Sequence, residues 1–126
     1  VSIPFPEEGF ISETPYKVIV ENRKKGLHTL CFLDIKSEEE RYMTVKEGLE
    51  ALLEVEKRMR KGVITQETLV VGFARAGSKE PRVKAGYVRE LVNCEFGAPP
   101  HTLVLQSSPR NHRNRFSNKF FKPLNR

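Results

Sequence analysis

Three short stretches carry the residue types best able to bind a ligand, and each lies at an end of a predicted buried strand. Asp34 ends the apolar run FLDI, Arg75 stands between small residues in ARAGS, and two prolines precede His101 in PPHTL. A carboxylate is costly to bury unless it is hydrogen-bonded. Gly77 allows backbone to approach a ligand closely, and histidine can bind or exchange protons near neutral pH. Because open α/β sheets bind ligands at strand ends, these stretches predict a binding edge.

Each stretch also has a structural interpretation. Asp34 can serve as an acceptor in a turn, ARAGS can be a strand end with a tight turn, and His101 can be a structural histidine, since no partner for a catalytic triad is evident. The sequence holds no Gly-rich phosphate loop, no G-x-S-x-G motif and no metal-ligand cluster. We therefore predict no catalytic acid, base or nucleophile and no metal site.

The composition is typical of one soluble domain. The chain has 126 residues, of which 38% are hydrophobic and 30% are charged. No apolar run reaches the ~18 residues of a membrane span, and VSIPFPEEGF lacks the features of a signal peptide. Cys31 and Cys94 do not form a C-x-x-C pair, so we expect reduced thiols in a cytoplasmic protein.

Strand and helix patterns alternate along the first 105 residues. The predicted elements are an edge strand at 1–5, a helix over 14–25, strands over 28–34, 68–75 and 101–105, and a helix over 44–61. Over 82–92 we expect a short strand or turn that leads into a short helix. The runs HTLCFLDI and TLVVGFA are continuously apolar, which predicts strands buried on both faces. The expected fold class is α/β, with a mixed central sheet and flanking helices.

The helix ends have recognisable sequence patterns. Thr44 and Glu47 have the spacing of a capping box, and Gly62 is expected to close that helix. In the first helix Thr14 is a candidate cap and Pro15 suits the first helical position. The Leu and Met stripe of the second helix predicts a face buried in the core.

Four separated blocks resemble one protein family in unbroken order. PYKVIVENRKKGLHTLCFLDI, RYMTVKEGLEALLEVE, TLVVGFARAGS and FGAPPHTLVL are similar to the C-terminal half of the diphthine synthases, which are methyltransferases of the diphthamide pathway with the tetrapyrrole methylase fold. VSIPFPEEGF resembles the segment between that family's two domains, and KSEEERYM resembles the short form seen in archaeal members. The resemblance implies a C-terminal methylase-type domain over 1–105, with a linker-like start at 1–13, followed by an atypical basic tail at 106–126.

The resemblance also implies a function. It indicates a homodimeric enzyme that uses S-adenosylmethionine to methylate the modified histidine of translation elongation factor two. In this family the cofactor lies between the two domains. Carried onto this sequence, the positions that contact its adenosine end, largely through backbone atoms, are Leu33, Ala76 and His101. The family's N-terminal domain, with its Gly-rich loop and G-D-P loop, has no counterpart here. We therefore expect a half-site that binds cofactor weakly and does not turn over alone.

The whole net charge comes from the tail. The chain carries +6, and residues 106–126 contain six Lys or Arg and no Asp or Glu, so residues 1–105 are neutral. One alternative function is therefore a small nucleic-acid-binding module that uses this tail, and another is a non-catalytic dimerisation domain. A third hypothesis is that the tail is a frame-shifted reading of the family's C-terminus, because a shifted frame of SPRNHRNRFSN can encode Pro-Gly followed by an acidic, apolar segment. Under that hypothesis the basic charge has no role and the tail should pack poorly.

Overall fold

A five-stranded mixed sheet forms the centre of the computed structural model, which describes residues 1–75, 77 and 79–107. The strands, in spatial order, are β1 (Ser2–Ile3), β2 (Thr29–Leu33), β7 (His101–Leu105), β5 (Leu69–Ala74) and β6 (Arg82–Tyr87). β1 runs parallel to β2, and the other neighbouring pairs are antiparallel. The predicted α/β class with a mixed sheet is confirmed. The expectations about the tail fall almost wholly on residues 108–126 and lie outside the described residues.

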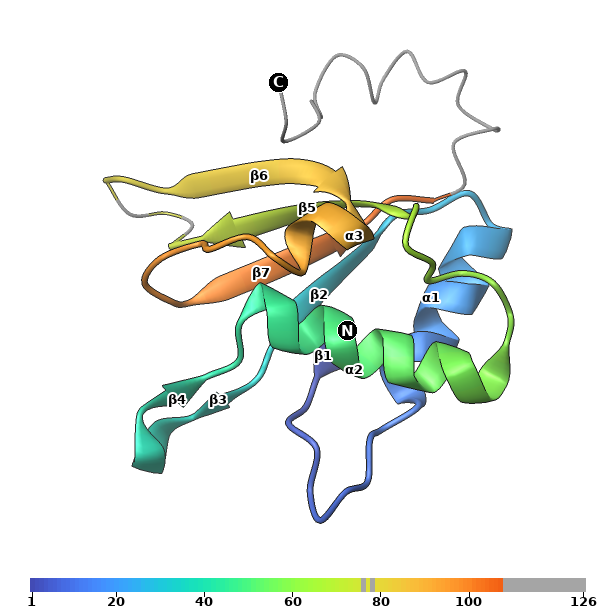
Figure 1. Cartoon of the computed structure of the whole chain (residues 1–126), viewed down its shortest axis with the longest axis horizontal. Coiled ribbons are helices and arrows are strands. Elements are labelled where there is room, and N and C mark those ends of the chain that lie inside the picture. Colours follow the sequence, from blue (N-terminus) through green and yellow to red (C-terminus); the bar gives the residue numbers. More distant parts are fainter. Residues whose placement is uncertain (76, 78, 108–126) are drawn as a thin grey trace.

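Helices pack against one face of this sheet (Figure 1). They are α1 (Thr14–Lys24), α2 (Val45–Met59) and the single turn α3 (Val88–Leu91). Their apolar residues share one core cluster with Cys31 and Leu33 of β2, Leu103 of β7 and Val70 of β5. A small hairpin of β3 (Ile35–Lys36) and β4 (Arg41–Tyr42), joined by the 3-10 turn η1 (Ser37–Glu39), extends from the sheet. The sequence pattern did not predict this hairpin, whereas β6 and α3 match the short strand and short helix predicted over 82–92.

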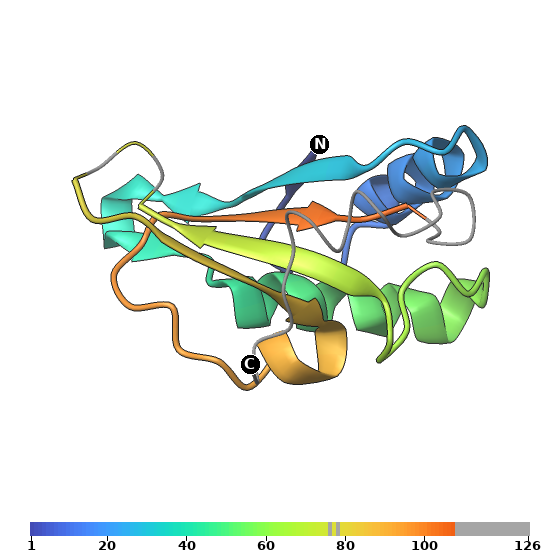
Figure 2. The same cartoon turned by 90° about the horizontal axis from the view of Figure 1, so that it is seen from above.

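No helix of the described part of the chain covers the opposite face of the sheet (Figure 2), although Val71 of β5 on that face is buried. Along β2, Thr29, Cys31 and Leu33 are buried, whereas Leu30 is 45% exposed and Phe32 is 55% exposed. The prediction that this apolar run is buried on both faces is therefore wrong. Continuous apolarity cannot distinguish a strand between two layers of the same chain from a strand whose second face is left uncovered.

The ends of α2 follow the sequence pattern at one terminus and depart from it at the other. Thr44 accepts a hydrogen bond from the Glu47 N–H, and the Glu47 carboxylate accepts one from the Thr44 N–H, so the predicted capping box is present. The helix ends at Met59, and Arg60, with φ of 56°, is the C-cap. Gly62, which was expected to close the helix, follows with φ of 73° in the loop.

The start of α1 also differs from the prediction. Thr14 is the first helical residue, and Glu13 takes the N-cap position without a side-chain hydrogen bond to the helix. The Thr14 N–H instead donates to the Ser12 hydroxyl. Pro15 lies in the first turn, as expected, and Gly26, with φ of 74°, follows the last turn.

Glu56 of α2 organises the loop that leads from this helix to β5. Its carboxylate accepts hydrogen bonds from the N–H groups of Gly62, Val63 and Ile64 and, at 2.7 Å, from the Tyr16 hydroxyl of α1. Burial opposes the charge on Glu56, but the hydrogen bonds outweigh it and hold the pKa of this carboxyl below its usual value. Burial and the Glu56 contact raise the pKa of Tyr16 to about 12. One carboxylate therefore ties α1, α2 and the following loop together.

Replacing Glu56 with Gln tests this arrangement. The amide cannot accept all four hydrogen bonds with the strength of a carboxylate, so we expect a loss of about 1–3 kcal/mol in the free energy of unfolding. Since the pKa of Glu56 is lower in the folded than in the unfolded chain, its stabilisation is complete at neutral pH and is lost as pH falls through the folded pKa. Urea denaturation at pH 7 and in acid should show the gap between wild type and Glu56→Gln closing in acid. A gap that is absent at pH 7, or constant with pH, would contradict this role.

Gly72 of β5 lets a helix-side aromatic ring approach the sheet. A Cβ at this position would lie 2.5 Å and 2.7 Å from Phe96 ring atoms. We therefore expect Gly72→Ala to destabilise the fold by about 1–3 kcal/mol. Denaturant unfolding of Gly72→Ala in a Phe96→Leu background provides the control, because the smaller side chain should remove most of this cost. An equal cost in both backgrounds would mean that the clash is not with Phe96.

Candidate functional site

The three stretches that the sequence predicts as ligand-binding meet at one end of the sheet. In the antiparallel register Phe32 pairs with Thr102 and Ala74 pairs with His101. Continuing the first ladder by one residue places Leu33 beside His101. The carboxyl ends of β2 and β5 therefore flank the first residue of β7. We call this region, formed by Leu33, Asp34, Ala74, Arg75 and His101, the strand-end edge.

The backbone of Leu33 and of His101 is turned inward at this edge. The N–H groups of Phe32 and Asp34 donate to β1, and the Arg75 N–H donates to the Pro100 carbonyl. Because backbone groups alternate sides along a strand, those of Leu33 and His101 point toward each other. The paired residues of β2 and β7 end one position earlier, at Phe32 and Thr102. The backbone groups of Leu33 and His101 therefore lie between β2 and β7, at the end of the paired part of the two strands.

The imidazole of His101 is occupied by the fold. The side chain is buried, its Nδ1 accepts a hydrogen bond of 3.2 Å from the Val45 N–H at the start of α2, and its Nε2 lies 3.0 Å from the Gly97 carbonyl oxygen. A backbone N–H can donate only to an unprotonated nitrogen, so Nε2 carries the proton and donates to Gly97. His101 thus anchors the amino end of α2, and only its backbone remains for a ligand.

The side chain of Leu33 is likewise committed to packing. It is 7% exposed, and a Cβ built on Gly48 of α2 would lie 2.8 Å from its Cδ2 atom. Gly48 is therefore the position that lets α2 come close to β2. As with His101, a role in binding is confined to the Leu33 backbone.

Asp34 connects the strand-end edge to the beginning of the chain. Its carboxylate accepts hydrogen bonds from the N–H groups of Phe5 and Ile35, at 2.8 Å and 2.9 Å, and its carbonyl accepts one from Met43 N–H. The structure therefore favours the turn-acceptor interpretation of this residue over direct binding. Its carboxylate fixes the N-terminal segment and the β3–β4 hairpin against the end of β2.

Arg75 is the side chain at the edge with a donor left over for a ligand. It has φ of 55°, a strained conformation for a non-glycine residue, and its Nε atom is buried with no hydrogen-bond partner among the described residues. A buried unpaired donor is uncommon in native structures and marks a place where an acceptor fits. Ala76, which the family resemblance predicts as a cofactor-binding position, lies outside the described residues.

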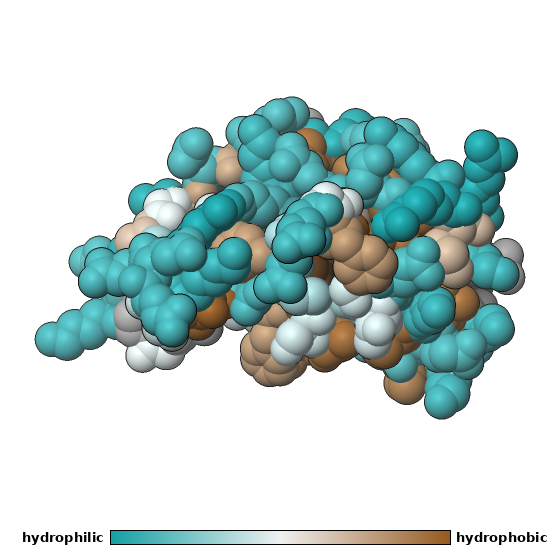
Figure 3. Space-filling view, turned by 90° about the horizontal axis from the view of Figure 1, so that it is seen from below, coloured by the Kyte–Doolittle hydropathy of each residue, from teal (hydrophilic) through white to brown (hydrophobic). Residues whose placement is uncertain are grey.

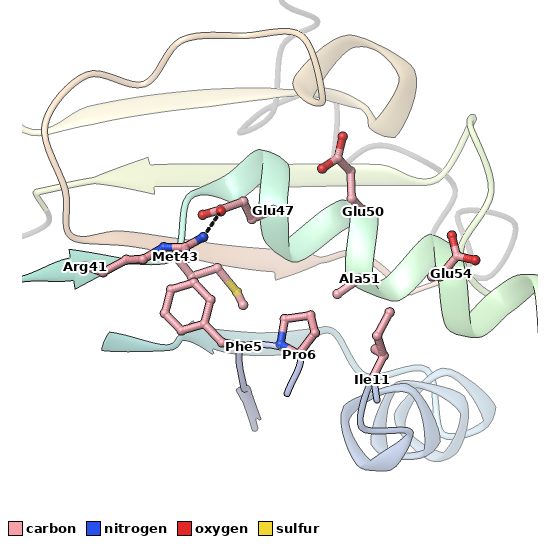
Figure 4. A pocket seen from close by; sticks show the side chains of 9 residues that line it. All are labelled: Phe5, Pro6, Ile11, Arg41, Met43, Glu47, Glu50, Ala51 and Glu54. Carbon is pink, nitrogen blue, oxygen red and sulfur yellow. Dashed lines mark hydrogen bonds and ion pairs between the residues drawn. The ribbon is translucent and has the colours of Figure 1, made fainter. Parts of the chain in front are cut away.

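An open hollow lies beyond Asp34, between the N-terminal segment and α2 (Figure 4). Its volume is about 340 Å³. Apolar side chains form one part of its wall, namely Phe5, Pro6, Ile11, Met43 and Ala51, and charged ones form the other, namely Arg41, Glu47, Glu50 and Glu54. Arg41 pairs with Glu47 and also lies over the Phe5 ring, 4.4 Å from its centroid. On this side of the molecule, small apolar patches alternate with hydrophilic side chains (Figure 3).

Burial and hydrogen bonding account for the shifted pKa values of two side chains near the edge. Burial raises the pKa of the Cys31 thiol to about 12, so this cysteine is an inert core residue. Burial opposes ionisation of Glu47, but its bonds to the Thr44 N–H and to Arg41 hold the pKa of its carboxyl below the usual value. Among the described residues no group of His, Cys, Asp and Glu could hold a metal ion. The edge is therefore a candidate for binding, without an acid–base pair or metal centre of its own.

Comparison with known sequences shows which proteins this chain is similar to. Over 106 residues the chain is 49% identical to diphthine synthase from Methanocaldococcus jannaschii, and over 104 residues it is 48% identical to the enzyme from Methanococcus maripaludis. The chain is related to the diphthine synthases. Each alignment covers 82% of this chain but 41% of the relative, so the chain spans about two fifths of the length of the curated relatives it matches. No protein-family model matches the sequence.

Solved structures of diphthine synthases share the fold. An Entamoeba histolytica protein assigned as a diphthine synthase matches with a TM-score of 0.85 and 36% identity, over 97% of this chain and 50% of that one. A second diphthine synthase crystal structure matches with a TM-score of 0.69 and 32% identity, over 84% of this chain and 37% of its own. The resemblance to diphthine synthases and to the tetrapyrrole methylase fold is thus confirmed in sequence and in structure.

Sequence reasoning missed several residues that build the edge. The roles of Gly48 and Gly72 depend on contacts across the sheet, and no local pattern marks them. The contact of His101 with Val45 joins residues 56 positions apart. The only available signal was the pair of prolines before His101, which indicated a fixed backbone but no partner.

We expect His101→Phe to lower the free energy of unfolding by about 1–3 kcal/mol, because the Val45 N–H and the Gly97 carbonyl lose their buried partner. Urea denaturation measures this cost. Phe96→Leu, a change in the ring that packs beside His101, controls for simple loss of aromatic packing. If His101→Phe kept full stability while ligand binding was lost, the imidazole would serve a ligand and the structural role would be wrong.

Proposed function

We propose that this chain is the C-terminal domain of a diphthine synthase, which uses S-adenosylmethionine to methylate the modified histidine of translation elongation factor two in the cytoplasm. The proposal is supported above all by the 49% identity to the Methanocaldococcus jannaschii enzyme. The register that brings Leu33 beside His101 supports it, because the resemblance predicts both as cofactor-binding positions. In the full-length family this domain acts together with an N-terminal domain, in a homodimer.

The residues at the strand-end edge fit the adenosine half of such a cofactor. Leu33, Ala76 and His101 are the proposed binding positions. The buried Arg75 Nε supplies a donor for a ligand oxygen or nitrogen. A flat, uncharged base is compatible with an edge built from apolar strand ends and backbone polar groups.

When bound, S-adenosylmethionine supplies the methyl group that is transferred. The residues of this domain would hold the adenosine end and orient it, since methyl transfer depends chiefly on alignment of donor and acceptor. This division of roles agrees with the absence of an acid–base pair at the edge. We propose that the isolated chain binds the cofactor weakly and has no turnover, since the groups that hold the remainder of the cofactor belong to the other domain.

The similarity to diphthine synthases favours this proposal over a nucleic-acid-binding module. That alternative is based on the basic residues of 106–126, whereas residues 1–105 have no net charge. In the described part of the chain, no helix is long and apolar enough to span a bilayer.

A chimera tests the proposed function directly. Residues 1–107 replace the corresponding C-terminal part of the Methanocaldococcus jannaschii enzyme, and transfer of a labelled methyl group to modified elongation factor two is measured. We expect activity from the chimera, and we expect Ala76→Phe to reduce it at least tenfold, mainly through a higher KM for the cofactor. Lys79→Phe, at an exposed position three residues further along the chain, is the matched control. A soluble, folded chimera that binds no cofactor would contradict the proposal.

A further inference from the structure

Arg75 has a side chain that no contact within the described part of the chain explains. Its Nε atom is buried without a hydrogen-bond partner, and no ion pair or cation–π contact of the described residues involves its guanidinium. A guanidinium stays charged at every pH at which proteins are folded. Burying part of it without an acceptor or a counter-charge is costly. Within residues 1–75, 77 and 79–107, this charge therefore has no partner.

The backbone holds Arg75 in an unfavourable conformation. Its φ of 55° lies in the left-handed region, which favours glycine. The Arg75 N–H donates at 2.8 Å to the Pro100 carbonyl, and the preceding residue, Ala74, pairs with His101. Two contacts with one segment thus fix the backbone from which the side chain starts. Strain of this kind, held in place by its surroundings, is typical of positions that bind a ligand.

The carboxylates around the strand-end edge are committed to other groups. The carboxylate of Asp34 accepts hydrogen bonds from two backbone N–H groups. Glu47, in the first turn of α2, is paired with Arg41. The negative charge that would complete Arg75 therefore fits a ligand better than a residue of the described chain.

The cofactor of the proposed function is negatively charged in one place, the carboxylate of its amino-acid end. Its adenosine is uncharged at neutral pH. A carboxylate oxygen is a stronger acceptor for a guanidinium N–H than an uncharged ring nitrogen or hydroxyl. We propose that Arg75 binds this carboxylate while the strand-end edge holds the adenosine. The inference rests on the proposed function, and it gives this domain one contact with the part of the cofactor that the other domain otherwise holds.

A second anchor has a consequence for the reaction. Adenosine held alone leaves the sulfur and its methyl group free to rotate about several bonds. A contact at the carboxylate restricts these rotations, and methyl transfer depends chiefly on the alignment of donor and acceptor. Arg75 is therefore a positioning residue for the methyl group, acting from the far end of the cofactor.

Titration of the ¹⁵N-labelled full chain tests the contact. The ligands are S-adenosylhomocysteine, its decarboxylated analogue and adenosine, and the amide signals of the strand-end edge are followed. We expect the wild-type chain to bind S-adenosylhomocysteine at least tenfold more tightly than the analogue, because the analogue lacks the charge-assisted hydrogen bond. Arg75→Gln should remove this difference and leave the dissociation constant for adenosine unchanged within about twofold.

Arg82→Gln is the matched control. Arg82 is exposed on β6 and pairs with Ala74 in the register, so it is a second cation close to the same edge. Its replacement should keep the difference between S-adenosylhomocysteine and the analogue. An equal loss in Arg82→Gln and Arg75→Gln would indicate a general attraction of anions and would contradict a specific contact.

The stability of the free chain separates a ligand-binding role from a structural one. Arg75→Asn is the second variant, because asparagine adopts a positive φ more readily than arginine does. We expect it to keep or raise the midpoint of urea unfolding while losing the tighter binding of S-adenosylhomocysteine. A lowered midpoint would show that the guanidinium supports the fold, and would overturn the proposal.

The three ligands distinguish failure of this inference from failure of the proposed function. If Arg75→Gln leaves the difference intact, or weakens adenosine and S-adenosylhomocysteine equally, Arg75 does not bind the carboxylate and the adenosine site still stands. If adenosine shifts no signal at the strand-end edge of the wild-type chain, the proposed function fails and this inference fails with it.

Discussion

The attachment of the amino end of α2 to the end of the sheet is the constraint on which the rest of the domain depends. The imidazole of His101 accepts a hydrogen bond from the Val45 N–H, and Gly48 lets the helix approach Leu33 of β2. Gly72 makes room for Phe96 beside Val45. These contacts bring β2, β5 and β7 into register beneath one helix terminus. The same contacts leave the backbone of Leu33 and His101, but not their side chains, at the strand-end edge.

This arrangement explains why the candidate site contains almost no chemically reactive side chain. His101 and Asp34, the residues whose types suggested chemistry, are both used to hold segments in place. Arg75, which has a strained backbone and an unpaired buried nitrogen, is the exception. A domain that presents backbone and apolar surface to a cofactor needs rigidity more than reactive groups, and the hydrogen bonds of Asp34, Glu56 and His101 provide it.

Local patterns in the sequence predicted most elements because those elements depend on short-range physics. The capping box of Thr44 and Glu47 and the apolar stripe of α2 placed that helix to within two residues. The predictions failed where the outcome depended on distant parts of the chain. Leu30 and Phe32 lie in a run as apolar as any core strand, but none of the helices in residues 1–107 covers their side of the sheet. The Cys31 side of the same strand is buried by helices whose docking no local pattern encodes.

The central claim is that the strand-end edge is the adenosine half of a methyltransferase cofactor site. The most direct measurement is an NMR titration of the ¹⁵N-labelled chain with adenosine at millimolar concentration, which detects weak binding to a half-site. The account predicts saturable shifts of the Leu33, Asp34 and His101 amide signals and of the signals from residues 74–77, with residues of the hollow and of the sheet face away from the helices little affected. Shifts confined to other surfaces, or none at the strand-end edge, would contradict it.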